Sequence, residues 1–526
     1  MGDYGISTDE FNADDYGRKA LAWYVSGFRD RSMFDSVEET LWFYGPWFHM
    51  AVASVQSLGL FDPWNVRHGM TFAIGLAGLA ALLPIGRLAV GRWAGFAAIV
   101  LCLITGNLYG SLFATPIDIP FLFAMTWATL AVMAMAARVV PSWPATIAGG
   151  AMTGLAIATR SSGIIAQVYL LGAMLLCMLE AIVRSSAWRA DLLQIAARLL
   201  AAVAIAWTVA FALWPWLQIG NPFTQFQEAF AYFAHYPNSF ETLLWGTPVL
   251  TTELPWFYIP AELAARLPEP FILLIAVGLL SALTGILGYL RVIRRQAEQG
   301  SVADFKAAAL RLAQSRQALV VWAAVILPAG FVVLAHSTLY DGIRHVIFLV
   351  PMLAVIAGTG AVHLAPLAKA LPAVFAGICG GFLGLQAWTL AVLHPLEYVA
   401  INAIAGGVRG AYGRFDLDYA SLAATVALRQ LGQRIDVETP RRFATSPPSI
   451  TVCIGFRAHA VAPMFRRPWR VEVDPGKADF LIATERWPCA DEVAGAVLID
   501  EVRRLDRVFA RTYARRPTHE PSMLSP

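Results

Sequence analysis

Residues 270–290 read PFILLIAVGLLSALTGILGYL, a run of 21 residues without a charged side chain. A helix needs roughly 20 apolar residues to cross a bilayer, so this stretch is predicted to be a membrane-spanning helix. The whole chain has the same character, because 58% of its 526 residues are hydrophobic and only 14% are charged. Soluble domains are nearer ~45–50% apolar and ~25% charged, so a soluble enzyme is excluded and a polytopic membrane protein is predicted.

Similar apolar runs occur along most of the chain, and about ten are long enough, or nearly long enough, to span a membrane. They are 66–86, 93–110, 117–137, 144–159, 163–183, 196–216, 270–290, 317–336, 345–362 and 371–393. The run 144–159 is the shortest of them. The segment 44–60 is also short and begins with aromatic residues, so it is predicted to lie in the membrane interface.

Basic residues in the short loops predict the orientation of these spans. They fall in every second loop, and such loops face the cytoplasm. These residues are Arg87, Arg92, Arg138, Arg184, Arg189, Arg291, Arg294, Arg295, Lys306, Arg311, Arg316 and Lys369. The alternate loops, 109–116, 217–268 and 337–344, are then expected to face outward, together with both termini.

Two outward termini create a topological problem. An acidic N-terminus would have to cross the membrane with no helix to carry it. We therefore expect a first span that precedes Met1 and is missing from this chain, which would bring the total to about eleven.

Three regions follow from this pattern. Residues 1–65 form a first outer loop with interfacial helices, and residues 66–393 form the transmembrane domain, with a large outer loop at 217–268. Residues 394–526 turn polar and are predicted to form a small α/β domain with a disordered tail from about Arg515. The elements expected there are a helix near 418–432 and strands at Ser449–Ile454, Trp469–Val473, Phe480–Ala483 and Ala496–Ile499.

Four carboxylates lie close together near the start of the chain, at Asp9, Glu10, Asp14 and Asp15. A carboxylate held at the edge of a bilayer can accept a proton from an acceptor hydroxyl while a lipid-linked donor lies alongside. The alternative is a solvated tail whose acids cap a helix. Both interpretations stay open on spacing alone.

Two further charged residues stand at the predicted outer ends of spans. Asp118 lies between Pro116 and Pro120, where an acid is costly unless it has a partner or a function. The alternative is a helix-capping aspartate. Arg160 breaks the inside bias of the basic residues and could bind an anion, although an arginine there can also reach up to lipid phosphate.

A third outer segment, Tyr340 to His345, opens the ninth predicted span. Arg344 and His345 would lie at a helix N-terminus, where backbone donors, the helix dipole and a guanidinium favour a phosphate. An ion pair between Asp341 and Arg344 is the structural alternative. The large outer loop adds a polar and aromatic mixture that includes Trp256 and Tyr258, which we expect to contribute to substrate binding.

Together these residues predict glycosyl transfer from a polyprenyl-phosphate sugar. The phosphate leaving group needs cations, and the acceptor hydroxyl must lose its proton to a carboxylate. A lipid-linked donor requires no nucleotide-binding glycine loop, and no P-loop or Rossmann signature occurs. No HxxxH spacing occurs, no metal site is predicted, and no cofactor is expected.

Several motifs resemble known proteins. They are YGISTDEF…DDYG (Tyr4 to Gly17), TPIDIPF (Thr115 to Phe121), GLAIATRSSG (Gly154 to Gly163), LPWFYIP (Leu254 to Pro260), YDGIRHVIFLVP (Tyr340 to Pro351) and a block from His394 to Tyr419. The order of these motifs along the chain, and the side of the membrane predicted for each, resemble those of the GT-C glycosyltransferases. The set is most similar to the superfamily of protein O-mannosyltransferases and aminoarabinose transferases, specifically bacterial family 39-like membrane enzymes.

The resemblance implies an inverting transfer on the outer face of the inner membrane. It implies Asp9 as general base with Glu10 beside it, Asp118 as a support for substrate binding, and Arg344 with His345 near the donor phosphate. The chain departs from the family in lacking a span before the acidic loop, which agrees with the missing first span. It also lacks a β-trefoil insertion, so a protein acceptor is not implied.

The sequence therefore predicts a multi-pass protein of the bacterial inner membrane, a hexosyl- or pentosyltransferase with its active site facing the periplasm. The expected partners are a polyprenyl-phosphate sugar, a lipid or cell-envelope glycan acceptor and membrane lipids, with no nucleic acid. A transporter or flippase of lipid-linked glycans is the alternative, and it would carry ionisable residues at mid-span. A non-catalytic scaffold would leave the outer acids unexplained.

Overall fold

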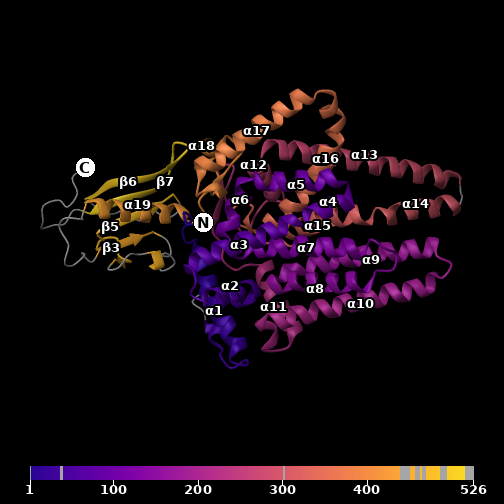
Figure 1. Ribbon diagram of the computed structural model, residues 1–526, viewed down its shortest axis with the longest axis horizontal. Helices are drawn as coiled ribbons and strands as arrows, with labels where there is room; N and C mark the ends of the chain where they lie inside the picture. Colours follow the sequence, from indigo (N-terminus) through magenta and orange to yellow (C-terminus); the bar gives the residue numbers. More distant parts are fainter. Residues whose placement is uncertain are drawn as a thin grey trace.

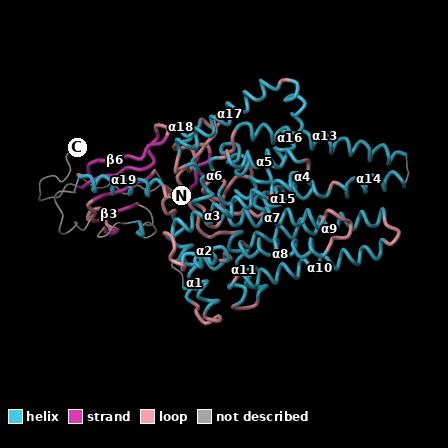
Figure 2. Tube along the Cα trace, in the orientation of Figure 1, coloured by secondary structure: helices cyan, strands magenta, loops and turns pink. Residues whose placement is uncertain are grey.

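The computed structural model describes residues 2–35, 40–299, 302–438, 450–455, 462–464, 469–485 and 495–515. A bundle of long, roughly aligned helices forms most of the molecule, and a small sheet domain lies beyond one end of it (Figures 1 and 2). The N-terminus lies at that same end, beside the sheet domain (Figure 1). The expected class, a helical membrane protein with a small C-terminal α/β domain, is confirmed.

Eight helical segments within the described residues are long and apolar enough to cross a membrane. The helices that form them are α3 (Pro63–Ala80) with α4 (Leu82–Ala89), α7 (Asp118–Met135), α9 (Ile165–Arg184), α10 (Trp188–Leu213), α13 (Glu269–Gln299), α15 (Arg316–Leu334), α16 (Val350–Ala370) and α17 (Pro372–Leu393). A ninth span results if α5 (Arg92–Leu103) and α6 (Gly106–Ala114), bent by 71°, count as one. The remaining predicted run, 144–159, forms α8 (Trp143–Thr159), which has 17 residues and packs against α7 and α10.

Helices α8 and α10 approach each other closely because small residues line their contact. Gly150 and Gly154 are spaced four apart on α8 and face Ala202 and Ala206 on α10. A Cβ on Gly154 would lie 2.4 Å from the carbonyl oxygen of Ala206, and one on Gly150 would lie 2.6 Å from that of Ala202. This is the small-residue packing by which helices associate where no hydrophobic effect drives them together.

We expect Gly154→Leu to lower the free energy of unfolding by about 3 kcal/mol, the upper end of overpacking costs, because the added side chain meets backbone atoms. The measurement is thermal unfolding of the purified protein in detergent. Gly172→Leu on α9 is the matched control, because a Cβ there meets nothing within 4 Å. Equal midpoints for the two variants would contradict the close packing of α8 against α10.

Shorter helices cover the end of the bundle near the sheet domain. They are α1 (Thr8–Val25), α2 (Trp47–Gln56), α11 (Pro222–Ala234) and α12 (Tyr258–Arg266), with a hairpin of β1 (Glu241–Leu244) and β2 (Thr247–Leu250). The predicted interfacial segment 44–60 contains α2, whose ten residues are too few to span a bilayer. At the opposite end of the bundle, α13 ends and α14 (Val302–Gln314) begins (Figure 1).

The C-terminal domain is a five-stranded sheet in the order β4-β3-β5-β7-β6, against which α19 (Leu422–Glu438) packs. The strands are β3 (Thr451–Ile454), β4 (Arg470–Val471), β5 (Phe480–Thr484), β6 (Ala496–Arg504) and β7 (Arg507–Arg515). Strand β3 runs parallel to β4 and β5, whereas β7 pairs antiparallel with β5 and β6. The helix and four strands agree with prediction; the expected tail beyond Arg515 lies outside the described residues.

Strand β7 was not predicted, although it lies between β5 and β6 in the sheet. It carries arginines at positions 507, 511 and 515, which are typical of a solvated segment. One of them, Arg511, binds Glu501 of the neighbouring strand at 3.2 Å, while its neighbours Ala510 and Thr512 are buried on the other face. Its charge is therefore balanced across the ladder, which sequence alone did not reveal.

Candidate active site

Arg344 stands at the centre of a charged cluster at the end of the helical bundle. Its guanidinium contacts three carboxylates through three different nitrogens. Nε lies 3.1 Å from Oδ2 of Asp118, Nη1 lies 3.1 Å from Oδ2 of Asp341, and Nη2 forms an ion pair with Asp9. These carboxylates come from separate parts of the chain, so the fold assembles the cluster.

Asp9, Asp118 and Arg344 are each held at the start of a helical element. Asp9 lies in the first turn of α1, and Asp118 is the first residue of α7. Arg344 opens the 3₁₀ segment Arg344–Leu349, which continues into α16. The turn before it has positive φ at Asp341 (61°) and Gly342 (65°), and Gly342 packs so closely on Arg266 that a Cβ would lie 2.5 Å from the guanidinium. Such a turn favours glycine and tolerates aspartate.

A second arginine, Arg160, reaches the same cluster. Its Nη1 lies 3.2 Å from Oδ1 of Asp118, so the two oxygens of that carboxylate each contact a different guanidinium. The guanidinium of Arg160 also lies 5.4 Å from the ring centre of Tyr44 and 5.8 Å from that of Phe233. Backbone pairing between Tyr44 and Arg160 fixes the loop before α2 to the end of α8.

Exposure separates Asp9 from the other two acids. The side chain of Asp9 is 26% exposed, whereas those of Asp118 and Asp341 are 5% exposed. A buried carboxylate needs a partner to offset its lost hydration, and the arginines supply it. Asp9 is therefore the carboxylate of this cluster that a molecule arriving from solvent reaches first.

Aromatic side chains surround the arginines. Arg344 lies 5.7 Å from the ring centre of Tyr419, and Tyr340 meets His345 edge-on with ring centres 4.3 Å apart. Burial raises the pKa of Tyr44 and the pKa of Tyr419 to about 12. Both phenols are thus protonated near neutral pH and can donate hydrogen bonds to an anionic ligand.

Most of the predicted site residues meet in this cluster. Those that do are Asp9, Asp118, Arg160, Tyr340, Arg344 and His345. Asp341, Tyr44 and Tyr419 belong to it as well but were not among the predicted site residues. Asp341 and Tyr419 stand within motifs that the sequence did single out, YDGIRH and the block ending at Tyr419, so the signal was their motif rather than their spacing.

Glu10 lies apart from the cluster, although it follows Asp9 directly. One carboxylate oxygen accepts the backbone N–H of Ser7 at 2.7 Å, and the other lies 3.0 Å from Nε2 of His68 on α3. The Ser7 and Glu10 pair forms a capping box at the start of α1. The fully buried Glu10 therefore anchors α1, and Asp14 does the same by pairing with the buried Arg67 at 2.8 Å.

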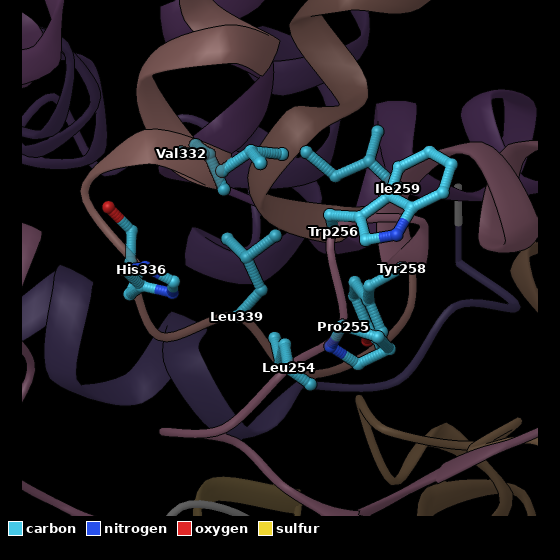
Figure 3. Close-up of a pocket in the computed structure, with 10 residues that line it drawn as sticks. Leu254, Pro255, Trp256, Tyr258, Ile259, Val332, His336 and Leu339 are labelled. Carbon is cyan, nitrogen blue, oxygen red and sulfur yellow. The ribbon is translucent and has the colours of Figure 1, made fainter.

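Trp256 and Tyr258 line a separate apolar pocket of about 60 Å³ (Figure 3). One wall is the segment that leads into the start of α12. The other wall is the end of α15 and the residues after it, and includes Val332, His336 and Leu339. Trp256 is 72% exposed, whereas Tyr258 is buried. Leu339 directly precedes Tyr340, so the pocket adjoins the charged cluster along the chain.

Within the described part of the chain, no group of three or more histidine, cysteine, aspartate or glutamate side chains is arranged to hold a metal ion. The three carboxylates of the cluster converge on Arg344 instead. The positive charge that this site offers to an anion comes from its arginines.

Comparison with solved structures returns membrane glycosyltransferases of the GT-C fold, the class that the sequence motifs resemble. ArnT from Cupriavidus metallidurans in the apo state matches with 14% identity and a TM-score of 0.47, over 97% of this chain and 94% of that one. Its complex with undecaprenyl phosphate matches with 13% identity and a TM-score of 0.41, over 99% and 96%.

The archaeal oligosaccharyltransferase AglB from Archaeoglobus fulgidus, in complex with an inhibitory peptide and a dolichol-phosphate, matches with 12% identity and a TM-score of 0.44. That match covers 87% of this chain and 59% of AglB. No protein-family model and no curated protein sequence matches the chain. With TM-scores below 0.5, these similarities assign no activity, substrate or partner to it.

Proposed function

We propose that this protein is an inverting glycosyltransferase that moves a sugar from a polyprenyl-phosphate donor to a lipid or cell-envelope glycan acceptor. The observation that carries the proposal is the arrangement of Arg344 among three carboxylates, of which only Asp9 is substantially exposed. A phosphate-binding cation and a solvent-facing carboxylate are the two groups that this reaction needs side by side.

The chemistry is a single displacement. The acceptor hydroxyl attacks the anomeric carbon of the donor sugar, its proton passes to the carboxylate of Asp9, and the bond between the anomeric carbon and the phosphate oxygen breaks. The electron pair of that bond leaves with the polyprenyl phosphate. One displacement inverts the anomeric configuration, and the guanidinium groups of Arg344 and Arg160 stabilise the charge that develops on the leaving phosphate.

The ion pair between Asp9 and Arg344 has to open for this reaction. Asp118 and Asp341 are buried and hold Nε and Nη1 of Arg344, so the exposed Asp9 is the partner that an arriving phosphate replaces at Nη2. Loss of that partner raises the basicity of the Asp9 carboxylate. Donor binding and activation of the base are thereby coupled, and the base is neutralised by Arg344 until donor arrives.

The pocket beside Trp256 and Tyr258 is assigned to the apolar part of a substrate. Its lining is mostly apolar, which suits the branched methyl groups of an isoprenoid chain better than the hydroxyls of a sugar ring. It stands at the end of α15, next to the segment that carries Arg344. A chain lying there would leave its phosphate free to reach the arginines.

We place the site on the periplasmic face of a bacterial inner membrane, because the basic loops predict that its end of the bundle faces outward. A transporter of lipid-linked glycans is the second candidate. The arrangement of the described charges favours the enzyme: the cluster around Arg344 sits at one end of the spans, and the buried pair of Arg316 with Glu180 lies near the other end.

The test is mass spectrometry of envelope lipids and glycans from matched strains with and without the gene. We expect the deletion to remove one hexose or pentose from a defined lipid or glycan and to leave its polyprenyl-phosphate sugar in excess. An unchanged set of glycans would contradict the proposal. Accumulation of a complete lipid-linked glycan inside the cell would favour the transporter instead.

A further inference from the structure

Residues 3–8, termed here the N-terminal strap, run between the membrane helices and the C-terminal domain, and residues 4–7 of the strap are buried. Tyr4 is 4% exposed and stacks on Phe113 of α6, with ring centres 4.3 Å apart. The hydroxyl of Ser7 donates to the carbonyl oxygen of Ala114 at 2.8 Å. Asp9 follows the strap directly, and Ser7 is the N-cap of the helix that carries it.

The C-terminal domain holds the other side of this strap. Arg429 on α19 donates from Nη2 to the carbonyl oxygen of Tyr4 at 2.7 Å and from Nη1 to that of Asp3. A Cβ on Gly5 would lie 1.8 Å from Oγ1 of Thr425, also on α19, so the side chain of Thr425 fits against the strap only because residue 5 is glycine. The backbone N–H of Thr8 donates to the carbonyl oxygen of Ala420 at 3.4 Å.

A second contact fixes the side chain of Tyr4. Its hydroxyl donates to Oε1 of Glu397 at 2.9 Å, and Nδ1 of His394 lies 2.7 Å from the same oxygen. Arg504 on β6 donates twice to the backbone oxygen of His394, at 2.8 Å and 3.0 Å. Burial, followed by the charge of Glu397, raises the pKa of Tyr4, so the phenol stays a donor.

We infer that the C-terminal domain is a positioning element for the proposed base, and that Arg429 is the positioning residue through which it acts. This inference rests on the proposed function, because it takes Asp9 as the base. Among the described residues, Arg429 contacts the strap at Asp3 and Tyr4 and not the charged cluster. It fixes the backbone of the strap, and the strap sets where the first turn of α1 begins. A displacement of a catalytic group by about 1 Å can cost about 10²-fold in rate.

The inference differs from two other roles for this domain. If the domain bound the acceptor, a substitution in the domain would change the KM for the acceptor. A domain that only stabilises the protein would lower the unfolding temperature and leave the turnover of the folded fraction unchanged. A positioning domain lowers kcat in protein that remains folded.

The first experiment is hydrogen exchange on the full-length protein, which needs no substrate. Arg429→Ala should speed amide exchange in residues 4–10 and leave α7 unchanged, and Arg429→Lys should restore part of the protection. Arg409→Ala is the matched control, because Arg409 belongs to the same region but pairs with the exposed Asp506. Unaltered exchange in residues 4–10 of Arg429→Ala would overturn the inference.

The second experiment is steady-state kinetics with a polyprenyl-phosphate sugar. We expect Arg429→Ala to lower kcat about 10- to 100-fold with unchanged KM for donor and acceptor, and Gly5→Ala to act in the same direction by displacing the strap. An unchanged kcat, or a change confined to acceptor KM, would overturn the positioning role. A further outcome is full activity of Asp9→Asn while amide exchange in residues 4–10 still rises in Arg429→Ala. That result would refute Asp9 as the base but would keep the conclusion that Arg429 fixes the strap.

Discussion

Asp9→Asn is expected to reduce glycosyl transfer by about 10²–10⁴-fold, the usual contribution of a general base, while the protein still folds. The amide has nearly the shape of the carboxylate and can still accept a hydrogen bond from Arg344, but it cannot take a proton from the acceptor hydroxyl. The measurement is turnover of the purified variant with a polyprenyl-phosphate sugar, together with its unfolding temperature.

The matched control is Asp15→Asn on the same helix. Asp15 pairs with Lys19 at 2.7 Å and is partly exposed, away from Arg344. Turnover of this variant should stay close to that of the unaltered protein. Near-normal turnover in Asp9→Asn would remove Asp9 from the role of base, whatever the control shows.

Arg344→Lys is expected to lower kcat/KM for the polyprenyl-phosphate sugar by about 10²–10³-fold. This is the loss typical when a hydrogen-bond donor that stabilises the transition state is removed. An ammonium group keeps the charge but cannot reproduce three directed contacts to Asp9, Asp118 and Asp341. Initial rates at varied donor concentration measure the effect. The KM for the donor should rise more than the KM for the acceptor.

Arg409→Lys serves as control for this second substitution, because Arg409 is 64% exposed in its ion pair and lies in the C-terminal region. It should leave both substrate dependences unchanged. A rise in acceptor KM alone for Arg344→Lys would show that the guanidinium does not bind the donor phosphate.

Much of the membrane domain follows from the sequence. A helix satisfies its backbone hydrogen bonds internally, so an uncharged run such as 270–290 can cross a bilayer without a partner segment. Length and apolar composition alone therefore predict the spans. Asp118 could be selected because a charge at the end of a span is costly without a partner. Arg160 was selected because it breaks the inside bias of the basic residues, and Arg344 because it opens a predicted span whose N-terminus favours a phosphate. The alternative weighed for Asp341, an ion pair with Arg344, exists in the structure and belongs to the same cluster.

What the sequence did not reveal depends on contacts between distant segments. Glu10 stands beside Asp9, but consecutive residues of a helix point about 100° apart, so one carboxylate reaches Arg344 and the other caps α1 against His68. Tyr419 lies next to Arg344 only because the block after α17 returns to the bundle. Trp256 was chosen for its chemistry and lines a neighbouring pocket instead.

The most direct test of the central claim is a structure of the protein with a polyprenyl-phosphate sugar bound. We predict that a phosphate oxygen lies within hydrogen-bond distance of the Arg344 guanidinium, with Asp9 displaced from Nη2 and turned toward the acceptor site. Asp118 and Asp341 should keep their contacts with Arg344. A phosphate bound elsewhere, with the pair of Asp9 and Arg344 intact, would contradict the account.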